Sequence, residues 1–191
     1  MALNESISLE ELVNGCKKGE EVHQRLLFEQ YYSIFMSICL RYTHSEHEAK
    51  DLIHEGFIKI YGRIGEYSGE GSFEGWMKRI IVNNAVDYCR KKSASKEMHV
   101  YDPVQFENQS EEQVDSDFVQ EIDQKEILHA VQGLSESYRA VFNLYVMEEY
   151  SHKEIADKLG ISVGASKSNL AKAKRNLRKA LQSLIDKRYV C

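Results

Sequence analysis

Proline and regular alternation of polar and apolar residues are almost absent from this sequence. Its 191 residues include one proline, Pro103. Proline breaks helices and alternation favours strands, so both absences indicate a helical chain. No stretch of 18 or more apolar residues occurs, and the N-terminus MALNESISLEEL lacks a basic leader followed by an apolar stretch. We therefore expect an all-α, cytoplasmic protein that does not insert into a membrane.

Paired cysteines are absent as well. The four cysteines lie far apart and form no C-x-x-C pair, which argues against a disulfide framework or a zinc knuckle; they are Cys16, Cys39, Cys89 and Cys191. We expect the first three to pack as small apolar groups, with a redox sensor as the alternative.

Motifs of catalysis are also missing. The sequence has no phosphate-binding loop, no nucleophile elbow and no pair of catalytic carboxylates. His44 and His47 are three residues apart, but no further ligand completes a convincing metal site, so they are assigned to the surface at a helix start. We expect a protein that is not an enzyme and that holds no metal or cofactor.

Charge is distributed unevenly along the chain. The net charge of −5 argues against a protein that simply coats nucleic acid. Residues 167–179 nevertheless contain six basic residues and no acid, whereas residues 102–126 contain nine acids and one lysine. A basic helix within an acidic chain can still bind DNA.

Capping boxes mark several helix starts. In this motif a Ser and a Glu or Gln three residues later satisfy each other's backbone donors, and it occurs at Ser8, Ser45, Ser110 and Ser151. Apolar residues at helical spacing predict helices over 23–41, 46–61, 73–92, 117–134 and 135–149, and the loop GRIGEYSGEGS separates the second from the third.

The predicted organisation is two small helical domains, residues 1–93 and 116–191. An acidic flexible linker, residues 94–115, joins them, because this stretch carries the proline, many acids and weak periodicity. The second domain has apolar core candidates at helical spacing, namely Val119, Ile122, Ile127, Val131, Leu134, Val141, Phe142, Tyr145, Ile155, Leu159, Leu170 and Leu177.

The most informative segment spans residues 151–181, and it reads SHKEIADKLGISVGASKSNLAKAKRNLRKAL. Ser151 caps a short helix, Gly160 permits a left-handed turn, and Ser162 caps the next helix, which is the pattern of a helix-turn-helix. One face of the second helix is expected to point inward, and it consists of Ser166, Leu170, Ala173 and Leu177. Its other faces carry lysine, arginine and short polar groups suited to duplex DNA.

Several classes of protein carry such a helix pair, among them response regulators, repressors and recombinases. A serine recombinase also needs a catalytic α/β domain with a serine nucleophile and clustered arginines, which the first ninety residues do not offer. A free-standing regulator that binds duplex DNA as a dimer stays open on this motif alone.

Three stretches of the sequence carry a specific resemblance. Residues 134–181, LSESYRAVFNLYVMEEYSHKEIADKLGISVGASKSNLAKAKRNLRKAL, resemble region 4 of extracytoplasmic-function sigma factors, the alternative specificity subunits of bacterial RNA polymerase. The segments AKDLIHEGFIKIY and FEGWMKRIIVNNAVDYCRKK are similar to regions 2.2 and 2.3 to 2.4 of the same family. The resemblances occur in the family's order and cover most of the chain.

The resemblance implies three sites and their partners. Asp51 and Glu55 would dock on the coiled coil in the largest subunit of core RNA polymerase. The −10 element of promoter DNA would be read and opened by Tyr67, Ser68, Asn83, Asp87, Arg90 and Lys91, with the loop 65–72 capturing an extruded base. The −35 element would be bound by Lys167, Ser168, Asn169, Lys172, Lys174 and Arg175, the last two toward phosphates. The family's habit also implies control by an anti-sigma factor.

Neighbours of these sites are assigned structural positions. Trp76 is expected in the core rather than as a stacking platform, because it lies between Phe73 and Ile80 at helical spacing. Asn84 is expected to face solvent.

Four residues depart from the family's commoner pattern. Ser166 stands where valine is frequent, and its hydroxyl is expected to bond back to the preceding turn. Asn169 replaces a frequent arginine, which would shift the preferred −35 sequence. Lys50 replaces an acid, and Gly56 replaces an apolar residue at a helix-propensity cost of about 1 kcal/mol.

Overall fold

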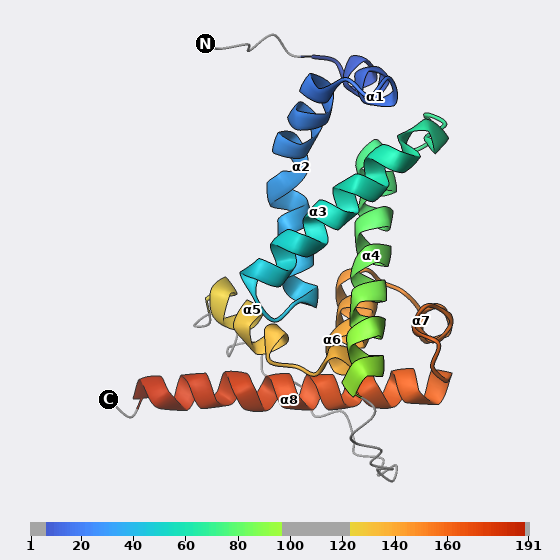
Figure 1. Ribbon diagram of the computed structural model, residues 1–191. Helices are drawn as coiled ribbons and strands as arrows, with labels where there is room; N and C mark the ends of the chain where they lie inside the picture. The colour runs from blue at the N-terminus through green and yellow to red at the C-terminus, as the bar shows by residue number, and fades with distance from the viewer. Residues whose placement is uncertain (1–6, 97–122, 190–191) are drawn as a thin grey trace. The chain divides into compact units, whose positions relative to one another are not determined.

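A computed structural model describes residues 7–96 and 123–189. Every regular element within these ranges is helical and no strand occurs in them, which confirms the all-α prediction (Figure 1). None of the helices in the same ranges is both long and apolar enough to cross a membrane.

Contacts divide the described residues into two compact units. The first contains residues up to 40 and residues 45–85, and the second contains residues 41–44 and those from 86 onward. The helix that begins at Phe73 is continuous across the division. The domain boundaries at 93 and 116 stay a prediction from the sequence.

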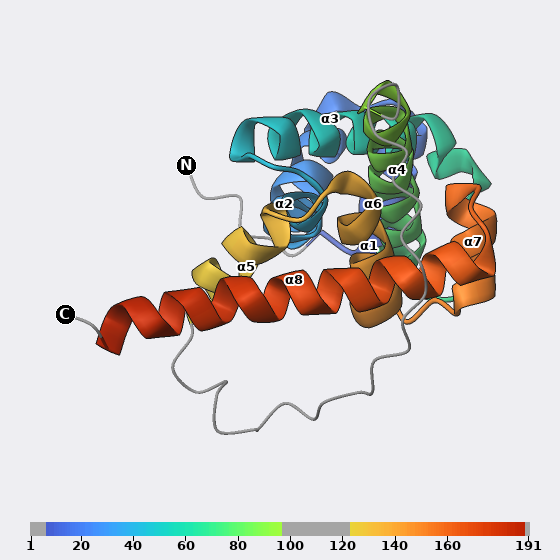
Figure 2. The same cartoon turned by 90° about the horizontal axis from the view of Figure 1, so that it is seen from below.

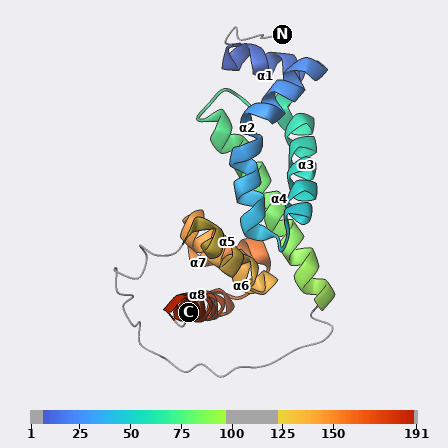
Figure 3. The same ribbon diagram turned by 90° about the vertical axis from the view of Figure 1, so that its left-hand side faces the viewer.

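The first unit contains α1 (Leu9–Lys17), most of α2 (Glu21–Tyr42), α3 (Glu46–Arg63), a short 3₁₀ turn (Ile64–Glu66) and α4 (Phe73–Lys96) as far as residue 85. Figure 3 shows α1 at the beginning of α2, and α3 beside α2. Aromatic rings join these two helices, since Phe28 lies 4.7 Å from Phe57 between ring centroids and 5.7 Å from His54. The predicted helices are present, and α3 continues past its expected end into the glycine-rich segment.

Serine caps set the starts of three helices, as predicted. The hydroxyls of Ser8, Ser45 and Ser151 accept from the backbone N–H three residues later, at 3.1, 3.3 and 3.3 Å. At Ser151 the box is reciprocal, because its own N–H donates to Glu154 at 2.8 Å. Each cap satisfies donors that the first helical turn leaves without partners. Ser110 lies outside the described residues.

Cys16, Cys39 and Cys89 are buried thiols, as small apolar groups would be. Burial raises the pKa of Cys16 to about 11, with Glu20 adding to the effect, and raises the pKa of Cys89 to about 12. Both thiols are therefore protonated at neutral pH, and the protonated thiol is the less reactive form. Cys191 lies outside the described residues.

The second unit contains α5 (Gln124–Gln132), α6 (Glu136–Phe142), a π-helical turn η3 (Asn143–Met147), α7 (His152–Leu159) and α8 (Val163–Tyr189). Helices α5, α6 and α7 all contact α8, and Figure 2 shows α5 and α6 at successive positions along it. An apolar cluster joins α5, α6 and α8; it consists of Val131, Leu134, Ala173 and Leu177, with Ala130, Tyr138 and Phe142 against it.

The π-helical turn corrects the expectation of one helix over 135–149. The N–H of Glu148 bonds to the carbonyl of Asn143 at 3.1 Å, a five-residue step that rotates the following side chains away from the α-helical register. Tyr145 is consequently 39% exposed, so its prediction as a core residue was wrong. Ile127 was also expected in the core but is 38% exposed, whereas Val119 and Ile122 lie outside the described residues.

Gly56 is buried where α3 approaches α4, and this packing explains the glycine. A Cβ added there would collide with the Cδ1 atom of Ile81, itself fully buried. Gly62 lies on the same helix but has no atom within 4 Å of the corresponding position. Glycine thus permits close helix packing at Gly56, whereas at Gly62 it only weakens the helix.

We expect Gly56→Ala to lower the free energy of unfolding by about 1–3 kcal/mol through overpacking. Gly62→Ala should raise it by about 0.5–1 kcal/mol, because alanine favours a helix and meets no neighbour. Chemical denaturation of both variants and the wild type measures this difference. Equal stability of the two variants would contradict the close approach at Gly56.

Candidate promoter and polymerase interfaces

The helix-turn-helix forms as the sequence predicts. Gly160 ends α7 in the left-handed conformation, with φ of 68°. The N–H of Ile161 then donates to the carbonyl of Ala156 at 3.1 Å, and the Ser162 hydroxyl accepts from the N–H of Ala165 at 3.0 Å. These contacts end one helix and start the next within three residues.

One face of α8 is buried, as expected for Ser166, Leu170, Ala173 and Leu177. The six predicted −35 residues lie on the remaining faces of the same helix. Lys167, Lys174 and Arg175 are exposed, whereas Ser168, Asn169 and Lys172 are half-buried. They span about 12 Å along the helix axis, close to the width of the DNA major groove.

The predicted −10 residues form two groups in the structure. Asn83, Asp87, Arg90 and Lys91 share one stripe of α4 by their helical spacing, and Asp87 pairs with Arg90 at 3.0 Å. Tyr67 and Ser68 instead lie in the loop before α4. The N-terminal end of α4 and Asn83 are about 15 Å apart along the helix.

Contacts within the first unit give the loop before α4 a defined shape. The Tyr67 hydroxyl donates to the carbonyl of Gly71 at 2.9 Å, and Lys17 donates to the Tyr67 carbonyl at 3.2 Å. The Tyr67 ring lies 4.9 Å from Phe73 and 5.7 Å from Trp76. Trp76 was expected in the core, but it is half-buried at the edge of this aromatic cluster. Ser68 is exposed beside the cluster.

Asn84 corrects the expectation that it faces solvent. It is 3% exposed, its amide donates to the Leu52 carbonyl at 3.1 Å, and Lys59 donates to its side-chain oxygen. Asn83 beside it is exposed. The two neighbouring amides therefore differ in role, since Asn84 ties α4 to α3 and Asn83 faces outward.

Asp51 and Glu55 both lie exposed on α3. A carboxylate oxygen of Asp51 lies 3.2 Å from Nδ1 of His47. Ile58 continues the same face by helical spacing and is 70% exposed, which is unusual for a large apolar side chain. Sequence reasoning missed Ile58, although its spacing from the two acids was visible. We call Asp51, Glu55 and Ile58 the α3 patch.

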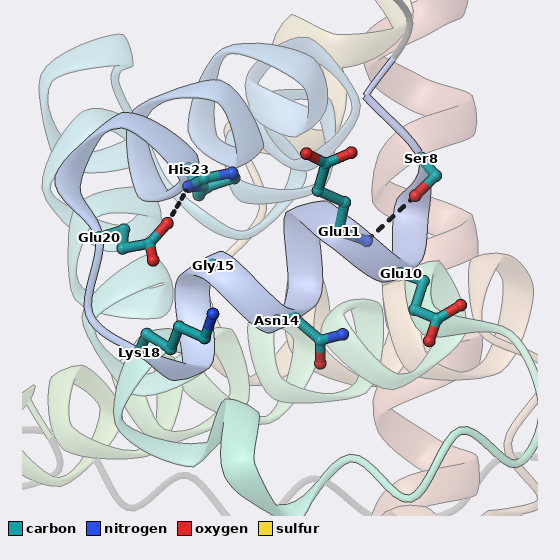
Figure 4. A pocket seen from close by; sticks show the side chains of 8 residues that line it. All are labelled: Ser8, Glu10, Glu11, Asn14, Gly15, Lys18, Glu20 and His23. Atoms are coloured by element: carbon teal, nitrogen blue, oxygen red, sulfur yellow. Dashed lines mark hydrogen bonds and ion pairs between the residues drawn. The ribbon is translucent and has the colours of Figure 1, made fainter.

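A hollow of about 400 Å³ lies between α1 and the start of α2 (Figure 4). The ring of His23 covers Gly15 there and lies 2.7 Å from a carboxylate oxygen of Glu20. No residue predicted for promoter or polymerase binding lines it. This hollow is therefore separate from the residues predicted to bind promoter DNA or polymerase.

Comparison with known proteins adds independent observations. The family models Sigma-70 region 2 and Sigma-70, region 4 match residues 27–95 and 124–177. The RNA polymerase sigma-H factor of Pseudomonas aeruginosa is 25% identical over 183 residues, covering 92% of this chain and 95% of that protein. The ECF RNA polymerase sigma-E factor of Escherichia coli K12 is 25% identical over 194 residues, covering 96% and 99%. A Bartonella quintana sigma factor, solved in complex with an anti-sigma factor, covers 83% of this chain and 96% of its own, with 16% identity and a TM-score of 0.49.

The two matched regions occur in the expected order and together cover more than half of the chain. The chain therefore belongs to the sigma-70 family, whose members are promoter-specificity subunits of RNA polymerase. Within the family it is an extracytoplasmic-function sigma factor, the type for which its relatives are named.

Asn84→Ala should lower the free energy of unfolding by about 1–3 kcal/mol, because it leaves buried polar groups without partners. Asn83→Ala, one residue away on the exposed side, should change it by no more than about 0.5 kcal/mol. Thermal and chemical denaturation compare the pair. A similar loss in both variants would show that burial does not distinguish them.

Proposed function

We propose that this protein directs core RNA polymerase to a set of promoters by binding the −35 duplex and holding the opened −10 strand. The observation that carries the proposal is the basic surface of α8, which lies on a capped helix-turn-helix in a chain that also contains sigma region 2. The chain itself supplies recognition, and nucleotide chemistry belongs to the polymerase.

At the −35 element, α8 enters the major groove. Lys167 and Lys172 bind guanine edges, and Lys174 and Arg175 neutralise phosphates with release of counterions. Ser168 and Asn169 add short polar groups that suit base edges or backbone oxygens. Asn169 in place of arginine gives this protein its own −35 preference.

At the −10 element, the residues on α4 and those in its preceding loop have different roles. Tyr67 and Ser68 capture an extruded base, which an aromatic ring can stack against. Asn83 and Asp87 read base edges one turn apart on α4. Arg90 and Lys91 hold the backbone, and binding would release Arg90 from its pair with Asp87.

The α3 patch docks on the coiled coil of the largest polymerase subunit. Asp51 and Glu55 supply negative charge, and Ile58 supplies the apolar contact that interface centres usually require. We expect the acidic linker predicted for residues 94–115, most of which lies outside the described residues, to run toward the RNA exit path. Control by an anti-sigma factor belongs to the same proposal and follows from the family resemblance.

Transcription with core polymerase on a promoter library tests the proposal. We expect specific transcripts only when this protein is present, with a shared −35 and −10 sequence among the active promoters. Lys167→Ala should relax the −35 preference and leave the −10 preference intact. If no promoter gives transcripts above core enzyme alone, the function is wrong; tight, specific binding by the protein alone would favour a free-standing regulator.

Ile58→Ser should weaken binding to core polymerase about tenfold, because an apolar anchor at the centre of an interface contributes strongly. Its melting temperature should not change, since the side chain is 70% exposed. Val22→Ser on α2 is the matched control, as Val22 is 57% exposed outside the α3 patch. Titration of labelled protein with core enzyme measures the affinity; equal affinities for the two variants would remove Ile58 from the interface.

A further inference from the structure

Ser166 has an unexpected hydrogen-bond partner. Its side chain is fully buried on the inner face of α8, where a hydroxyl without a partner would be destabilising. The expected bond to the preceding turn is replaced by one across the helix-turn-helix, because the hydroxyl lies 2.9 Å from Nδ1 of His152. His152 is the first residue of α7. A polar contact therefore joins the two helices of the motif.

The π-helical turn η3 places a third group beside this contact. Tyr145 stacks on the His152 ring, with centroids 4.6 Å apart and planes 23° apart. The stack gives the exposed Tyr145 ring a packing partner outside the core. It also restricts the imidazole to the plane from which Nδ1 meets Ser166.

The electrostatic surroundings suit a neutral ring. Burial lowers the pKa of His152, and the ammonium groups of Lys167 and Lys174 lower it further. The ring is thus uncharged at neutral pH and does not repel the two lysines proposed for promoter binding. Ser166 directly precedes Lys167, so holding Ser166 also sets the direction in which Lys167 leaves α8.

We propose that His152 is a positioning residue for −35 recognition, which holds α8 in register on α7 through Ser166 and is itself oriented by Tyr145. This inference rests on the proposed function. His152 and Ser166 then act as one unit, so that the loss of either residue has the effect of losing both.

Four variants of the full-length protein, bound to core polymerase, test the pair: His152→Phe, Ser166→Ala, the double variant and His152→Asn. The readout is the ratio of transcripts from two promoters that share a −10 element and differ in a preferred or scrambled −35 element. Phenylalanine keeps the stack on Tyr145 but removes Nδ1, and alanine removes the Ser166 hydroxyl without adding an atom to a fully buried position. His129→Phe, at an exposed position on α5, is the matched control.

We expect each single variant to lower the ratio about five- to tenfold, the size expected for one lost hydrogen bond. The double variant should lose no more than the worse single variant, and the asparagine, which keeps a polar group near the Nδ1 position, should retain most of the ratio. His129→Phe should match the wild type. Circular dichroism at the assay temperature checks that each variant is folded.

Three results would overturn the inference while leaving the proposed function intact: unchanged ratios in folded single variants, losses explained by unfolding alone, or losses that multiply in the double variant. Absence of promoter-specific transcripts with the wild-type protein would instead reject the proposed function.

Discussion

Burial of one face of α8 is the constraint on which the second unit depends. Ala173 and Leu177 join Val131 and Leu134 in a cluster that α5 and α6 complete. A helix has a single direction in which its buried face can point, so this packing also directs the basic side chains outward. The same contacts that stabilise the unit therefore create the basic surface that we propose for the −35 element.

The first unit uses α3 in a comparable way. Its inner face packs on neighbouring helices, and Gly56 permits the approach of Ile81 from α4. The outer face is left with two carboxylates and the exposed Ile58. An interface with a partner can thus arise from residues that intramolecular packing does not require.

Adjacent residues on one helix can differ completely in burial and in hydrogen bonding. Asn83 and Asn84 are chemically identical neighbours, yet one faces outward and the other bonds to the carbonyl of Leu52. Ser166 and Lys167 are likewise adjacent, the first buried and the second exposed. A helical step of about 100° separates such neighbours, so a proposed contact must be assigned residue by residue.

The amino-acid sequence by itself determined the all-α class, the serine caps, the Gly160 turn, the buried face of α8 and the resemblance to sigma regions 2 and 4. These features depend on periodicity or on contacts within a few residues, which a sequence displays directly. Tertiary structure alone decided the burial of Asn84, the packing reason for Gly56, the exposure of Tyr145 and the bond between His152 and Ser166. Each of these depends on which side chains meet across different helices, and in η3 on a local change of helical register that apolar spacing does not encode.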